Sequence, residues 1–324
     1  MSYDVVTLGE TMLRLTPPGM MRFEQTRTLE VHAGGSESNT AVGLARLGAK
    51  VAWLSRLTDN PFGRMIASEL AAQAVDVSHV VWTDEDRVGT YYLERGKAPR
   101  GSRVIYDRKF SAASRFAPDE LPLNLFEPGR AKLFHTTGIS IGISKESAVT
   151  VYQAARLAKT ANWLVSFDLN YRSKLWTPTE ARAECESLMK LADLIFLPRR
   201  DANSIFGIES QQPSEILEQL AGTFPQGTIV LTLGAQGAVA RTSAGQTFSQ
   251  PAFPADEVER LGGGDAFSAG FLYRYLVARD VASALAWGAA TAALKYSIPG
   301  ELPLVRKDEV ETLLQSSGSA TVSR

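Results

Sequence analysis

Short apolar segments alternate with longer helix-like segments along most of the chain, and this alternation constrains the fold most. The candidate strands are Val5–Leu8, Val51–Ser55, Lys132–Thr136, Trp163–Asp168, Leu194–Leu197 and Thr228–Leu233. Helical patterns lie near residues 38–47, 61–73, 144–160, 178–190, 213–222, 265–278 and 281–295. Because runs such as LIFL and IVLTL are apolar on both faces, they are typical of a parallel sheet that is covered by helices. The sequence therefore predicts an α/β fold with a mainly parallel central sheet flanked by helices.

Two stretches interrupt this alternation, at about 11–32 and 87–107. Each alternates polar and apolar positions around Pro/Gly turns, which is typical of strand pairs with one solvent-exposed face. The two can meet as one small β lid or remain two unrelated surface hairpins. An exposed lid would also offer its edge strands to a second copy of the chain. We expect one domain over residues 1–315, followed by a flexible polar tail at 316–324.

Composition restricts the class of protein. The 324 residues are 44% hydrophobic and 21% charged, which suits a globular protein with a large core. The net charge of -1 gives no electrostatic reason to bind nucleic acid or an anionic membrane. Cys185 is the only cysteine, so an intramolecular disulfide is excluded. Without a recognisable signal peptide or long apolar span, we expect a cytoplasmic protein.

The stretch ERLGGGDAFSAGF at 259–271 is the strongest chemical signal. It places Gly262, Gly263 and Gly264 directly before Asp265, at the start of an expected helix. The first amides of a helix lack intrahelical partners, and glycines let an anion approach them closely. A carboxylate there is suited to accept a proton from a hydroxyl that attacks phosphorus. A glycine turn with an aspartate N-cap is the alternative, and this stretch alone does not exclude it.

An ordered series of stretches carries a family resemblance. GGGDAFSAGF and GGSESNTAVGLARLG resemble the two signatures of the PfkB, or ribokinase-like, carbohydrate kinases. LRLTPPGMMRF, GTYYLERG, VIYDRKFSAAS, HTTGIS, FDLNYRSKLW and LKYSIPG are similar to the branch that acts on 2-dehydro-3-deoxygluconate (KDG). The resemblance implies a ribokinase-like fold with a β lid, with ATP and Mg²⁺ as requirements. It also implies that Asp265 is the catalytic base and that the Gly262–Gly264 amides bind the transferred phosphoryl group.

The resemblance also nominates binding residues. For the sugar acid these are Gly34, Gly35, Asn39, Tyr91, Tyr106, Arg108, Ile139, Arg172 and Asp265. For ATP they are Thr232, Gly234, Gly237, Gly262 and Gly264. Arginine binds a carboxylate well, so Arg108 and Arg172 point to an acid sugar. Helix capping by Asn39, ordinary aromatic cross-strand pairing and a G-x-x-G hairpin turn are the structural alternatives. Asp168 and Asn170 are expected to order their loop through local backbone bonds.

Two departures from the family pattern bear on cations. Glu259–Arg260 stands where relatives have Asp-Thr, near the place where some of them bind a monovalent cation, so dependence on such a cation is left open. Arg260 would lie either beside the phosphates or on the surface. PRRD at 198–201 replaces N-x-x-E, which leaves Asp201 as the only metal nomination, through water. The three histidines show no metal-ligand spacing.

The function expected from these residues is ATP-dependent phosphorylation of the 6-hydroxyl of KDG. A kinase of a neutral sugar such as fructose or ribose is the nearest alternative, and the paired arginines argue against it. A sugar-binding regulator that lost catalysis on the same fold is the other. A Rossmann dehydrogenase is disfavoured because VVTLGETMLRL lacks G-x-G-x-x-G.

Overall fold

The computed structural model describes residues 2–315 and, within them, joins nine strands into a central sheet. The strands are β1 (Val5–Leu8), β4 (Val51–Leu54), β6 (Val75–Asp76), β10 (Leu133–Thr137), β11 (Leu164–Asp168), β12 (Leu194–Pro198), β13 (Thr228–Thr232), β14 (Ala238–Arg241) and β15 (Thr247–Gln250). Their order across the sheet is β15-β14-β13-β12-β11-β10-β1-β4-β6. All neighbours from β13 to β6 pair in parallel, and only the pairs that involve β14 are antiparallel. The predicted α/β class is confirmed.

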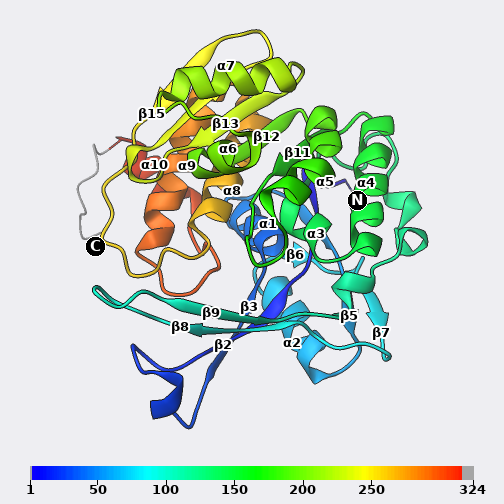
Figure 1. Cartoon of the computed structure of the whole chain (residues 1–324). Coiled ribbons are helices and arrows are strands. Elements are labelled where there is room, and N and C mark those ends of the chain that lie inside the picture. The colour runs from blue at the N-terminus through cyan, green and yellow to red at the C-terminus, as the bar shows by residue number, and fades with distance from the viewer. Residues whose placement is uncertain (1, 316–324) are drawn as a thin grey trace.

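Helices cover both faces of this sheet, as the apolar strands require. One core packs β-strand side chains against α1 (Ser36–Arg46), α2 (Pro61–Ala71), α8 (Gly263–Ala278) and α9 (Val281–Tyr296). The other packs the opposite face against α4 (Lys145–Thr160), α5 (Pro178–Leu191), α6 (Arg199–Phe206) and α7 (Pro213–Thr223). Neighbouring residues separate accordingly, since Val5 lies in the first core and Val6 in the second. Figure 1 shows the helices arranged around the sheet.

Short elements account for most of what the periodicity did not predict. Helix α3 (Gly138–Gly142) is too short to carry a helical repeat, and α10 (Lys307–Gln315) is only nine residues long. Strands β5 (Arg56–Thr58) and β7 (Val81–Thr83) form a separate two-stranded sheet. β15 was missed because its four residues, TFSQ, form no apolar run, and none of them is fully buried. The predicted tail at 316–324 lies outside the described residues.

The two interrupting stretches meet as one four-stranded sheet, here called the lid sheet. It consists of β2 (Met12–Thr16), β3 (Glu30–Gly34), β8 (Thr90–Glu94) and β9 (Arg103–Asp107), in the order β3-β2-β8-β9. Parallel pairing of β2 with β8, with Leu13 opposite Thr90, joins the two hairpins. The alternative of two unrelated hairpins is therefore wrong. Figure 1 shows the lid sheet below the central sheet, with α2 beside it.

None of the helices in residues 2–315 has the length and apolar character needed to cross a bilayer. Cys185 is buried in α5, and its pKa is raised by that burial.

Candidate functional site

The glycine run forms the start of α8, and its three glycines differ in what they contact. Gly262 is in the left-handed region at φ 77°, and a Cβ there would lie 2.1 Å from the Glu301 carbonyl oxygen. A Cβ on Gly263 would lie 2.3 Å from the ring of Tyr296. A Cβ on Gly264 would meet no atom within 4 Å. Packing therefore explains the first two glycines, whereas Gly264 faces open space that a ligand can fill.

Asp265 is held by side chains from another segment. Its Oδ1 accepts a hydrogen bond from Ser36 Oγ at 2.6 Å, and its Oδ2 accepts one from Asn39 Nδ2 at 2.8 Å. Asn170 Nδ2 in turn donates to Ser36 Oγ at 2.6 Å. Asn39 lies inside α1 and does not cap it, because the N-cap is Gly35. The capping alternative for Asn39 is therefore wrong.

Two carboxyl groups at this site have raised pKa values. Burial raises the pKa of Asp265, and the hydrogen bonds from Ser36 and Asn39 oppose that rise. Burial raises the pKa of Asp168 to about 7, with the nearby charge of Asp265 adding to the effect and Arg172 opposing it. Asp168 also accepts a hydrogen bond from the Asn170 backbone N–H at 3.0 Å, as predicted. The Asn170 side chain does more than order this loop, since it reaches Ser36.

The nominated sugar residues gather around one cavity between the lid sheet and α8, here called the lid cavity. Its lining includes every residue nominated for the sugar acid: Gly34, Gly35, Asn39, Tyr91, Tyr106, Arg108, Ile139, Arg172 and Asp265. It also includes residues that sequence reasoning missed, among them Glu10, Ser36 and Glu301. The nominated residues come from six separate stretches, so their convergence is a property of the fold. Their roles in binding stay predictions.

The two arginines of the lid cavity have different partners. Arg108 Nε donates to Glu10 Oε2 at 2.7 Å, and Ser111 Oγ donates to the other oxygen of the same carboxylate. Arg172 Nη1 donates to the Tyr171 carbonyl at 3.2 Å, and its charge acts on Asp168 and Asp265. Arg172 is thus held by a backbone oxygen, whereas Arg108 is held by a buried carboxylate.

The tyrosines of β8 face opposite sides of the lid sheet. Tyr91 is 4% exposed, stands opposite Tyr106 in the register, and its hydroxyl donates to Glu301 Oε1. Burial, followed by the charge of Glu301, raises the pKa of Tyr91 well above its usual value. Tyr92 packs edge-on against Phe23 on the outer side. Tyr91 and Tyr106 therefore form a cross-strand pair, and both also line the lid cavity.

A second cavity, here called the hairpin cavity, lies on the other side of the α8 N-terminus. Its lining combines Thr232, Gly234 and Gly237 from the β13–β14 turn with Gly263 and Gly264 of α8. Apolar walls come from Ala252, Phe253, Phe267, Ala289, Ala292, Ala293 and Tyr296. Gly262, which was nominated for ATP, lines the lid cavity instead. The start of α8 therefore separates a polar cavity from a cavity with glycine and apolar walls.

Asp201 is the one nominated metal residue, and its surroundings fit an indirect role. The side chain is fully buried in α6, where Oδ1 accepts from Arg200 Nε at 2.8 Å and Oδ2 has no partner among the described residues. Its charge acts on Asp168, so the two carboxyls lie near each other. Within residues 2–315 no three His, Cys, Asp or Glu side chains gather in a way that could hold a metal ion. Magnesium held mainly by phosphates and water fits this donor set.

The segment before the glycine run carries one buried and one exposed charge. Glu259 is 9% exposed and its Oε1 accepts from Arg14 Nη1 at 3.1 Å. The Arg260 side chain is 65% exposed and pairs with Glu257 at 3.4 Å. Of the two alternatives for Arg260, the surface position is the observed one.

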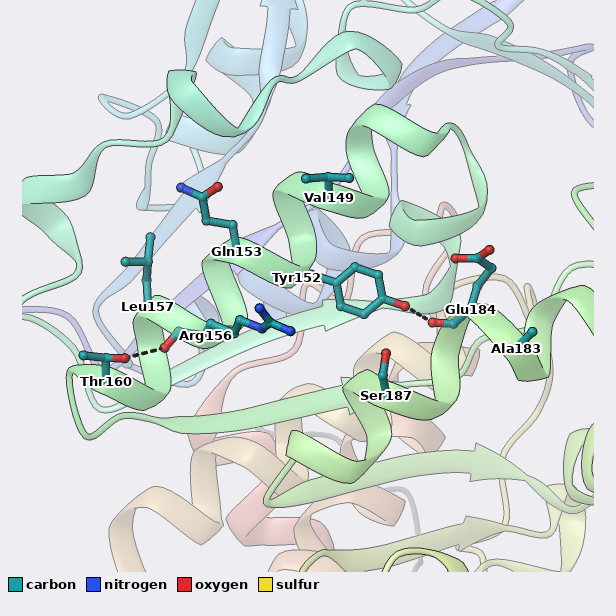
Figure 2. A pocket seen from close by; sticks show the side chains of 9 residues that line it. All are labelled: Val149, Tyr152, Gln153, Arg156, Leu157, Thr160, Ala183, Glu184 and Ser187. Atoms are coloured by element: carbon teal, nitrogen blue, oxygen red, sulfur yellow. Dashed lines mark hydrogen bonds between the residues drawn. The ribbon is translucent and has the colours of Figure 1, made fainter.

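A larger hollow lies away from these residues, between α4 and α5. It has a volume of about 600 Å³, whereas the lid cavity has about 100 Å³. Figure 2 shows its lining, where the Tyr152 hydroxyl donates to the Glu184 carbonyl across the gap. None of the nominated residues lines it. Size therefore does not identify the functional site here.

Comparison with known proteins identifies the class. A model of the pfkB family of carbohydrate kinases matches residues 3–302, so the chain belongs to that family, as predicted. Across its whole length the chain is 43% identical to the 2-dehydro-3-deoxygalactonokinase of Haloferax volcanii, all of which is covered. It is 30% identical to the 5-dehydro-2-deoxygluconokinase of Clostridium tetani, over 90% of this chain and 86% of the relative.

A solved structure extends the similarity to three dimensions. The 2-dehydro-3-deoxygluconokinase of Thermotoga maritima superposes with a TM-score of 0.91 at 30% sequence identity. The match covers 98% of this chain and 99% of that one. The ribokinase-like fold is therefore confirmed together with the family.

Proposed function

We propose that this chain transfers the γ-phosphoryl group of ATP to the terminal hydroxyl of a 2-dehydro-3-deoxyhexonate. For KDG this is the 6-hydroxyl, and the products are ADP and the 6-phosphate. One observation carries the proposal: Asp265 stands at the start of α8, with a cavity that contains two arginines on one side and a glycine-lined cavity on the other.

Asp265 is suited to be the general base. The hydroxyl oxygen attacks the γ-phosphorus while its proton passes to the Asp265 carboxylate, and ADP leaves. Ser36 and Asn39 hold the two carboxylate oxygens, so a sugar hydroxyl would find the acceptor already oriented. Because both bonds stabilise the charged form, they keep a buried carboxyl available as a base.

The amides at the start of α8 are suited to the transferred phosphoryl group, apart from that of Gly263, which donates to the Arg260 carbonyl at 3.2 Å. Gly264 leaves open space at its α-carbon on the hairpin-cavity side, which allows close approach of phosphate oxygens. The positive end of the helix dipole favours the charge that develops there. Mg²⁺, bound to the ATP phosphates, would neutralise part of their charge. Asp201 is the residue proposed to hold one of its waters, through the Oδ2 that has no partner among the described residues.

The substrate carboxylate is assigned to the arginines of the lid cavity. Arg172 has no carboxylate within salt-bridge distance among the described residues, so its guanidinium is the freer of the two. Arg108 donates to the Glu10 carboxylate through Nε and Nη2. A substrate carboxylate would therefore approach its remaining nitrogen, Nη1. Charge-assisted pairs of this kind are stronger than neutral hydrogen bonds.

The hexonate is assigned as a class with two principal members. KDG is the substrate predicted from the residues, and 2-dehydro-3-deoxygalactonate, its C4 epimer, is the substrate in the name of the 43% identical relative. A third keto acid is 5-dehydro-2-deoxygluconate, which has its keto group at C5 and its deoxy carbon at C2 and is the substrate in the name of the 30% identical relative. A neutral sugar and a role as a non-catalytic binding protein are the alternatives.

The test is a substrate panel with ATP and Mg²⁺, in which ADP release is measured. The panel contains the three keto acids, fructose and ribose. We expect kcat/KM for at least one 2-dehydro-3-deoxyhexonate to exceed that for either neutral sugar by tenfold or more. Preference for a neutral sugar would replace the acid assignment. Sugar binding without ADP release would support the non-catalytic alternative.

A further inference from the structure

Lys295, in the last turn of α9, has a fully buried side chain that ends on backbone oxygens. Its Nζ donates to the carbonyl oxygen of Glu259 at 3.0 Å and to that of Ile298 at 3.2 Å. The side chain is 0% exposed and belongs to the largest completely buried side chains of the described chain. Because an unpaired buried ammonium is strongly unfavourable, these contacts need an explanation.

The two carbonyls belong to segments that meet directly before the glycine run. Glu259 lies three residues before Gly262, and its backbone N–H donates to the Tyr296 carbonyl at 3.2 Å. The carboxylate of Glu259 accepts from the Gly300 N–H at 2.8 Å. Lys295 therefore lies at the centre of the contacts that attach the segment before α8 to the end of α9. The two helices pack side by side (Figure 1).

The charges around Lys295 mostly favour its ammonium. Glu259, Glu301 and Asp265 stabilise the charged form, while Arg14, which contacts the first two carboxylates at 3.1 and 3.5 Å, opposes it. Burial lowers the pKa of Lys295 to about 8, so the side chain is mostly charged at neutral pH. An ammonium surrounded by carbonyl oxygens presents the same contacts that a potassium ion takes from a protein.

We propose that Lys295 is a positioning residue for phosphoryl transfer, a covalently attached cation that fixes the carbonyls of Glu259 and Ile298. It thereby sets the position of the Gly262–Gly264 backbone at the start of α8. This inference rests on the proposed function and adds an element to it: the chain carries its own monovalent cation. Turnover is therefore independent of dissolved potassium, because the space near these carbonyls is filled by the lysine.

The first test removes the ammonium group of Lys295, and added monovalent cations are then offered in its place. Lys295→Met keeps most of the length of the side chain but cannot donate, and Lys295→Ala leaves room for an ion. The control is Lys190→Met, on an exposed lysine of α5. In the wild type and the control we expect ADP release to change less than about twofold between potassium and choline salts. Both Lys295 variants should lose about 10- to 100-fold in kcat, since a small misplacement of reacting groups costs up to about 100-fold.

Rescue distinguishes a positioning role from a general loss of stability. Potassium, ammonium or methylammonium should restore kcat of Lys295→Ala in a saturable way and should do less for Lys295→Met, whose side chain fills the space. If Lys295→Ala folds only in potassium and not in choline, the proposal is supported as well. Failure to fold in any salt, without recovery of folded protein by Lys295→Arg, would overturn it.

Readouts that need no sugar separate this proposal from the proposed function. ATP affinity by calorimetry and amide hydrogen exchange over residues 257–264 can be measured even if no sugar is turned over. We expect weaker ATP binding and faster exchange in both variants, with Lys190→Met unchanged. Unchanged ATP affinity and exchange in Lys295→Met and Lys295→Ala, or a wild type that requires potassium, would contradict the assignment of Lys295.

Discussion

Arg108 Nε donates to Glu10 Oε2 at 2.7 Å, so one of the two arginines in the lid cavity already has a carboxylate partner. Glu10 is 3% exposed, and removal of its cationic partner would leave a buried charge without compensation. A substitution of Arg108 therefore changes both stability and binding. Arg172, whose contact is the Tyr171 carbonyl, gives the cleaner test of carboxylate recognition.

Arg172→Gln should lower kcat/KM for the keto acid by about 10- to 150-fold. A charge-assisted pair contributes about 1.5–3 kcal/mol, and each 1.4 kcal/mol corresponds to about tenfold. The loss on fructose or ribose should be much smaller. The matched control is Arg182→Gln, whose exposed ion pair on α5 contributes little. Equal losses on acid and neutral sugars would remove the carboxylate role of Arg172.

Arg108 requires a double variant. Arg108→Gln should lower kcat/KM for the acid substrate. It should also lower the free energy of unfolding by about 3–5 kcal/mol, because a buried ion pair is broken. Glu10→Gln/Arg108→Gln removes both charges and should recover stability without recovering kcat/KM. Urea unfolding and initial rates on the same preparations separate the two effects. Recovery of kcat/KM in the double variant would mean that Arg108 only compensates Glu10.

Gly264→Ala should stabilise the protein and impair catalysis. The new Cβ meets no protein atom within 4 Å, and alanine is favoured over glycine in a helix by about 0.5–1 kcal/mol. The methyl group would crowd phosphate oxygens, so we expect kcat to fall tenfold or more. Gly222→Ala on α7, which also meets open space, is the control and should raise only the melting temperature. Normal kinetics in Gly264→Ala would show that no ligand approaches this backbone.

Gly263 is a less informative position than its sequence context indicates. The pattern predicts that a β-branched residue there blocks phosphate approach, but the added Cβ would already lie 2.3 Å from the Tyr296 ring. Gly263→Val would therefore disturb packing and catalysis together. The left-handed backbone belongs to Gly262, not to Gly263.

Asp168 should make stability depend on pH. Its pKa is raised to about 7 from 3.8, so the folded state holds a proton that the unfolded state has already lost between these values. The stability that this group contributes is present at low pH and is lost as the pH rises through 7. Asp168→Asn should therefore stabilise the protein at pH 8 relative to the wild type, and do so less at pH 5. A difference of about 1–3 kcal/mol is expected, at about 1.4 kcal/mol per pKa unit.

Urea unfolding at pH 5 and pH 8 measures this difference. The side-chain amide that Asp168→Asn introduces can still accept the Asn170 N–H through its oxygen, so the loop contact is retained. The control is Asp84→Asn, at an exposed carboxyl, which should leave the free energy of unfolding unchanged at both pH values. A pH-independent effect of Asp168→Asn would mean that the carboxyl ionises normally in the folded protein.

The sequence predicts elements whose apolar pattern is long and regular, and it fails where a contact is distant or a segment is short. β1 and the long helices follow from periodicity within a few residues. The polar α6 carries only eight residues and could not be recognised in this way. The parallel pairing of β2 with β8 joins residues that lie 77 apart, as the pair Leu13 and Thr90 shows (90 minus 13), and no local signal specifies it.

The residues of the candidate site also divide into those that the sequence predicts and those that only the fold reveals. Asp265 and the arginines were nominated because the family resemblance marks them. Ser36 and Glu10 were missed because a serine and a glutamate near a helix or strand end are ordinary, and only the fold brings Ser36 to a carboxylate 229 residues away. Lys295 was missed because a lone lysine in an alanine-rich helix gives no sign that it is buried.

Asp265→Asn removes the proposed catalytic base while it keeps the shape of the side chain. The variant should fold, because its amide can accept from Ser36 and Asn39 can present its unpartnered Oδ1 after an amide flip. The measurement is single-turnover ADP formation with saturating ATP and keto acid, alongside ATP affinity by calorimetry. We predict a rate loss of at least about 10²–10⁴ with ATP affinity nearly unchanged, because an amide cannot accept the hydroxyl proton. A variant that keeps most of the wild-type rate would contradict the account.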